Sequence, residues 1–105
     1  MSRTWAVGLI AMLAGAAGGC GEPASPLAER GRQVYLSQCI ACHNPDPGQP
    51  GAVGPAVKGA TQPLLEAKIL HGTYPPGYAP KRPTKVMPPQ PGIAAEIGAL
   101  AAYLK

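Results

Sequence analysis

Cys39-Ile40-Ala41-Cys42-His43 is the stretch of sequence that decides how this chain folds. It has the pattern C-x-x-C-H, in which two thiols lie three positions apart and an imidazole directly follows the second. Three kinds of site use a C-x-x-C pair: dithiol redox centres, halves of zinc sites, and covalent haem attachment sites, where the histidine is also required.

The first two kinds of site fit the remaining sequence poorly. A thioredoxin-like pair belongs to a βαβ unit, and no such pattern surrounds residues 39–43. Structural zinc needs four Cys or His ligands, usually in two paired clusters, whereas the chain has three cysteines, two histidines and no second cluster. We therefore interpret the motif as a haem attachment site. Cys39 and Cys42 would bond the two vinyl groups of one haem, and His43 would lie under the iron.

The segments around this motif resemble the small, single-haem, class I c-type cytochromes. Gly31 and Tyr35 stand where that family has the glycine and the aromatic residue of a helix crossing. Gly54-Pro55 resembles the loop under the proximal histidine, and residues 100–104 resemble the C-terminal helix. The resemblance covers residues 27–105. It implies an all-α class I cytochrome c fold, with three to four short helices and proline-rich loops wrapped around one covalent haem c.

Residue patterns predict where the first two helices lie. Ser25-Pro26 is typical of a helix start, so the first helix should run from about Leu27 to Gln38. Its apolar face should contain Leu27, Gly31, Val34 and Tyr35. The second helix should run from Thr61 to His71, with Thr61 as its cap and Gly72 ending it. Its buried face should contain Leu64, Leu65, Ile69 and the stem of Lys68.

A third helix is expected over residues 93–105. Its apolar residues recur at helical spacing, at Ile93, Ile97, Leu100 and Leu104. In the resemblance this helix crosses the first one at Gly31, where we expect Leu100 and Tyr103 to make the contact.

The resemblance also implies the two axial ligands of the iron. His43 is the expected proximal ligand, with its Nδ1–H bonded to a carbonyl, that of Pro55. Met87 is the only methionine outside the first eighteen residues, and it precedes the terminal helix, where the family carries its distal methionine. Two alternatives stay open for the sixth position: His71, or no protein ligand.

His/Met ligation implies a one-electron carrier, because a six-coordinate haem leaves no position for substrate. The chain has only five carboxylates, no close pair of them suited to acid–base chemistry, and no glycine-rich phosphate loop. We therefore expect no enzyme activity. The alternative function is a haem enzyme or sensor with a labile sixth ligand, either peroxidase-like or gas-binding.

The first twenty residues have the pattern of an export signal. Arg3 precedes an apolar run over residues 5–18, which is shorter than the about 20 residues of a membrane-spanning helix. Ala17-Gly18-Gly19-Cys20 resembles a bacterial lipoprotein cleavage site. The expected organisation is a signal peptide at 1–19, a tether at 20–26 and a cytochrome domain at 27–105, exported to the periplasmic side and lipid-anchored through Cys20. The alternative is cleavage after residues 14–16, which would leave a soluble periplasmic protein.

Charge bears on the expected partners. The net charge is +4, without the patterning that nucleic-acid binding requires. Lys81, Arg82 and Lys85 flank Met87, where they would steer acidic docking surfaces; Arg82 would alternatively pair with a haem propionate. Tyr74 and Tyr78 are further candidates for bonding the propionates. The expected partners are membrane redox complexes or other cytochromes.

Overall fold

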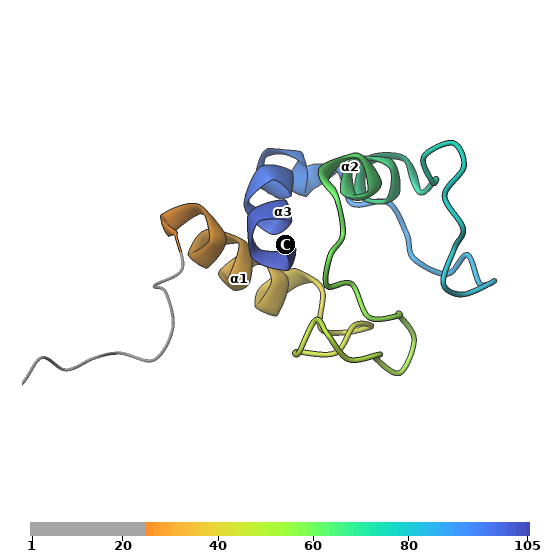
Figure 1. Ribbon diagram of the computed structural model, residues 1–105, viewed down its shortest axis with the longest axis horizontal. Helices are drawn as coiled ribbons and strands as arrows, with labels where there is room; N and C mark the ends of the chain where they lie inside the picture. Colours follow the sequence, from red (N-terminus) through yellow and green to blue (C-terminus); the bar gives the residue numbers. More distant parts are fainter. Residues whose placement is uncertain (1–24) are drawn as a thin grey trace, which may run out of the picture.

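The computed structural model describes residues 25–105, which form helices joined by long irregular loops (Figure 1). The elements in chain order are α1 (Pro26–Gln38), α2 (Gln62–His71), the 3-10 helix η1 (Pro91–Glu96) and α3 (Ile97–Leu104). Within this range there is no strand, and no helix has the length and apolar character needed to cross a bilayer. The predicted all-α class is confirmed. The signal peptide, Cys20 and most of the tether lie outside the described residues.

Helix α1 begins one residue before the predicted start. The Ser25 hydroxyl accepts a hydrogen bond from the Ala28 amide at 3.1 Å, and Pro26 occupies the first helical position, where its missing N–H costs nothing. Gly31, Val34 and Tyr35 are buried as expected. Leu27 is not: it is 54% exposed. The first turn of α1 extends beyond α3 in Figure 1, so none of the helices that the structure describes covers it.

Helix α2 follows the prediction at both ends. The Thr61 hydroxyl accepts from the Leu64 amide, and Gly72 ends the helix in the left-handed conformation, with φ of 66°. A residue with a side chain is strained in that conformation, whereas glycine is not. Leu65 and Ile69 are buried, and Leu64 is half-buried.

The third predicted helix is divided into two elements. Residues 91–96 form η1, in which Ile93 has φ of −104° and ψ of 20°, outside the helical range. Gly92 disfavours a regular first turn, because glycine loses much backbone freedom when it is fixed in a helix. The α-helix therefore starts at Ile97. Ile97, Leu100 and Leu104 of the apolar stripe are buried, while Ile93 is only partly buried.

Gly31 marks the point where α1 and α3 cross. A Cβ atom at this position would overlap the Ala99 carbonyl and lie 2.8 Å from the Tyr103 Cβ. The expected contact with Tyr103 is confirmed, but Ala99, rather than Leu100, supplies the other one. The backbone of α3 therefore lies directly on α1. The rings of Tyr35 and Tyr103 pack beside the crossing, with centroids 5.7 Å apart.

Replacing Gly31 by valine should lower the free energy of unfolding by about 1–3 kcal/mol, because the added methyl groups would push against a backbone carbonyl that cannot rotate away. Urea denaturation of the haem-containing protein measures the change. Gly98→Val is the matched control, since a Cβ at Gly98 on α3 meets nothing within 4 Å. Equal stability of the two variants would show that the crossing does not require glycine.

Candidate haem site

The C-x-x-C-H motif continues α1 for one further turn. The Cys39 amide donates to the Tyr35 carbonyl at 2.9 Å, and the His43 amide donates to the Cys39 carbonyl at 3.0 Å. The Tyr35 hydroxyl then donates to the Asn44 carbonyl at 2.5 Å. Burial raises the pKa of Tyr35 to about 12, so the hydroxyl stays protonated as the donor throughout the physiological range. The motif is therefore fixed to α1 at both of its ends.

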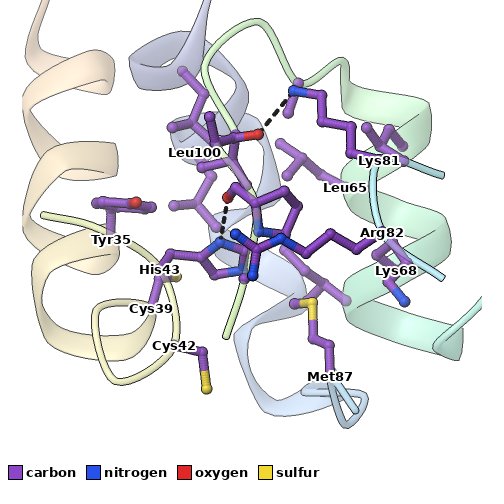
Figure 2. A pocket seen from close by; sticks show the side chains of 18 of the residues that line it. Tyr35, Cys39, Cys42, His43, Leu65, Lys68, Lys81, Arg82, Met87 and Leu100 are labelled. Carbon is purple, nitrogen blue, oxygen red and sulfur yellow. Dashed lines mark hydrogen bonds between the residues drawn. The ribbon is translucent and has the colours of Figure 1, made fainter. Parts of the chain in front are cut away.

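The motif opens onto a cavity of about 580 Å³ between the helices and the two long loops. This volume lies in the range of cofactor pockets. Figure 2 shows some of the side chains that line it. Its walls include core residues, namely Tyr35, Leu65, Ile69, Leu100 and Leu104. The predicted site residues Cys39, Cys42, His43 and Met87 all line this one cavity.

The loop that follows the motif fixes the imidazole of His43. Nδ1 lies 2.9 Å from the Pro55 carbonyl oxygen, and because a carbonyl can only accept, Nδ1 carries the proton. The expected hydrogen bond to Pro55 is thus confirmed, and in the neutral ring Nε2 keeps a free lone pair. The imidazole lies on Gly54, where a Cβ would overlap the ring. Gly54 is therefore required for the close approach of the loop.

Met87 reaches the cavity from the second long loop. It is half-buried and packs against the hydrophobic core, and Figure 2 shows its thioether turned toward the cavity. His71, the alternative sixth ligand, lies at the exposed end of α2 and does not line the cavity. Of the two protein groups considered for the sixth position, only Met87 borders the space that His43 borders.

The character of the cavity fits a haem. Two thiols, an imidazole and a thioether are the groups that attach and ligate c-type haem. None of the carboxylates in the described part of the chain lines the cavity, whereas four cationic side chains do: Lys58, Lys68, Lys81 and Arg82. A haem is an apolar plate with two negatively charged propionates. The apolar walls of the cavity fit the plate, and its cationic side chains complement the charge of the propionates.

Two competing interpretations of the cysteines find no support. Burial raises the pKa of the Cys39 thiol, whereas reactive dithiol cysteines have lowered values. Across residues 25–105, no three side chains among Cys, His, Asp and Glu come together as a metal cluster, as structural zinc would need.

The sequence did not predict several contacts that the structure shows at this site. Lys81 and Arg82, interpreted as docking charges or propionate partners, donate to backbone carbonyls of residues 51–56. Tyr74 and Tyr78 stack with centroids 5.3 Å apart, and the Lys68 ammonium lies 4.4 Å above the Tyr74 ring. No local sequence pattern predicts such contacts, because they depend on how two irregular loops pack against each other.

Comparison with known protein families identifies the chain. The family model described as cytochrome C oxidase, cbb3-type, subunit III matches residues 26–104. No curated protein and no solved structure matches the chain at a significant level. The match spans all the described helices and the whole cavity. The chain therefore belongs to this family of c-type cytochrome domains, whose chemistry is haem-based electron transfer in a respiratory context.

Proposed function

We propose that the protein is a one-electron carrier with a single covalent haem c, ligated by His43 and Met87. The observation that carries this proposal is that the imidazole and the thioether line the same apolar cavity. One C-x-x-C-H motif occurs in the sequence, which supports one haem. Reversible Fe(III)/Fe(II) exchange of one electron is the chemistry that the group supplies when bound.

Different residues of the chain would attach the haem and ligate its iron. Cys39 and Cys42 would hold the group covalently. His43, oriented by Pro55, would present Nε2 to the iron. Met87 would occupy the sixth position and stabilise the ferrous state, because a thioether is a soft ligand. His43 and Met87 are both half-buried, and their apolar surroundings beside the core would limit the access of water and raise the reduction potential. With both axial positions filled, the site would pass electrons and have no place for substrate.

Membrane redox complexes or other cytochromes are the proposed partners, since the family is a component of a respiratory oxidase complex. Lys85 is exposed and is available to steer acidic docking surfaces. The lipid anchor on Cys20 and the periplasmic location remain proposals that rest on the sequence of the first twenty residues.

Covalent attachment is tested with Cys42→Ala, which should abolish stable haem-containing protein, because one of the two covalent bonds and the geometry of the motif are lost. Haem staining of denaturing gels, after expression with haem-maturation machinery in an oxidising compartment, gives the yield. Ile40→Ala is the matched control, because its side chain lies in the same motif and is exposed. Normal staining of Cys42→Ala would contradict the assignment.

Distal ligation is tested with Met87→Ala. The ferric protein should lose its sulfur-to-iron charge-transfer band, and its reduction potential should fall because the soft ligand is gone. Absorption spectroscopy and a redox titration measure both. His71→Ala is the control and should leave the band intact. If the wild type lacks the band, and His71→Ala changes the spectrum whereas Met87→Ala leaves it unchanged, then His71 is the ligand.

The anchor is tested by fractionating cells that express the wild type or Cys20→Ala. The wild type should pellet with membranes and be released only by detergent, because more than one acyl chain gives stable anchoring. The Cys20→Ala protein should not show detergent-dependent release. A wild type that is soluble after lysis, with its N-terminus near Ala17, would instead establish ordinary secretion.

A further inference from the structure

The segment that carries Met87 is held by unusually few hydrogen bonds. We call residues 79–89 the Met87 segment. Before it, the Tyr78 amide bonds the Pro75 carbonyl, and after it, the Gln90 amide bonds the Ile69 carbonyl. Between these two points, the described structure contains no backbone–backbone hydrogen bond of the segment. Four of its eleven residues are prolines, which have no N–H to donate.

Two cationic side chains make the only hydrogen bonds of this segment within the described part of the chain. Arg82 donates from Nη1 to the Val53 carbonyl at 2.6 Å and from Nη2 to the Gly51 carbonyl at 3.2 Å. Lys81 donates from Nζ to the Ala56 carbonyl at 2.8 Å. Hydrogen bonds from a charged donor are roughly twice as strong as neutral ones. The segment is therefore attached to residues 51–56 through side chains alone.

Residues 51–56 are themselves fixed to the haem motif. The Gly54 amide donates to the Cys42 carbonyl at 2.8 Å, and the Gly51 amide donates to the Gly54 carbonyl at 2.9 Å. The next residue, Pro55, bonds His43. Arg82 thus binds the same short loop that orients the imidazole. Met87 lies in the segment that Arg82 and Lys81 attach, and His43 is hydrogen-bonded to the loop to which they attach it.

Among the residues that the structure describes, neither of these two cations forms a salt bridge. The salt bridges of that part of the chain join Arg30 to Glu96 and Arg32 to Glu29. Lys85 lies in the same segment as Arg82, but it is exposed and makes no hydrogen bond in the described structure. The segment therefore contains two bonding cations and one exposed cation that can serve as an internal control.

We propose that Arg82, assisted by Lys81, is a strap that holds the Met87 segment against the loop of His43 and so sets how readily Met87 leaves the iron. This inference rests on the proposed His/Met ligation. Arg82 and Lys81 are positioning residues in this account, since they act through Met87. Without the strap the thioether is chemically unchanged, but the segment spends a larger fraction of time open.

Imidazole binding to the ferric haem protein measures that open fraction, because an external ligand binds only when Met87 has left and its apparent affinity scales with the open population. Arg82→Ala should raise the apparent affinity about tenfold to a hundredfold, and Lys81→Ala should raise it less. Arg82→Lys, which keeps the charge and loses the fork, should restore part of the wild-type behaviour. Lys85→Ala should match the wild type. Unchanged haem content and circular dichroism confirm that each variant is folded.

Each outcome decides the proposal. If Arg82→Ala fails to fold, Lys81→Ala and Arg82→Lys carry the test, and wild-type affinity in both would overturn the strap. An equal increase in Lys85→Ala and Arg82→Ala would also overturn it, in favour of a general effect of charge. If the wild type lacks the sulfur-to-iron band and binds imidazole at once, both the proposed His/Met ligation and the proposed strap are wrong. If the wild type shows the sulfur-to-iron band and Arg82→Ala binds imidazole with the wild-type affinity, the strap is wrong while the His/Met ligation stands.

Discussion

The hydrogen bond from His43 Nδ1–H to the Pro55 carbonyl is the interaction on which the rest of the site depends. It fixes the tautomer of the ring, so that Nε2 keeps a free lone pair with which it can ligate a metal. The bond requires residues 51–56 to lie against the motif, which in turn requires glycine at position 54, because the imidazole occupies the space of a side chain. Helix α1 supplies the other half of the arrangement. Tyr35 lies in the last turns of α1, and its hydroxyl donates a hydrogen bond to the Asn44 carbonyl, directly after His43.

The core and the cofactor cavity share the same side chains. Tyr35 and Leu100 are the largest fully buried side chains of the described residues, and both line the cavity. A domain of this size has too little apolar surface for a large margin of stability. Val53 and Val86 of the cavity wall are 43% and 63% exposed, so a bound haem would cover apolar surface that the protein alone leaves exposed. Stability and function are therefore expected to depend on the same packing, centred on the α1–α3 crossing at Gly31.

Local chemistry made much of this structure predictable. Ser25, Thr61 and Gly72 begin or end helices because each satisfies backbone groups at a helix terminus, and such signals are read from a few adjacent residues. The motif was likewise read from five adjacent residues, whereas Met87 was predicted because it is the only methionine outside the first eighteen residues and because of its place in the family resemblance; both line one cavity. The third helix was predicted too long, since the helical spacing of Ile93 and Ile97 hid the irregular start at Pro91 and Gly92. Leu27 was misassigned because periodicity does not reveal where a neighbouring helix stops. The contacts of Lys81 and Arg82 depend on two loops distant in sequence, so no local pattern encodes them.

The central claim is that His43 and Met87 together close the haem site, which makes the protein a carrier rather than a haem enzyme or sensor. The most direct measurement is the absorption spectrum of the reduced wild-type protein before and after addition of carbon monoxide. The account predicts that the bands of the reduced protein stay in place, because the thioether already occupies the sixth position. An immediate shift to a carbon monoxide complex would show an open site and would contradict the account.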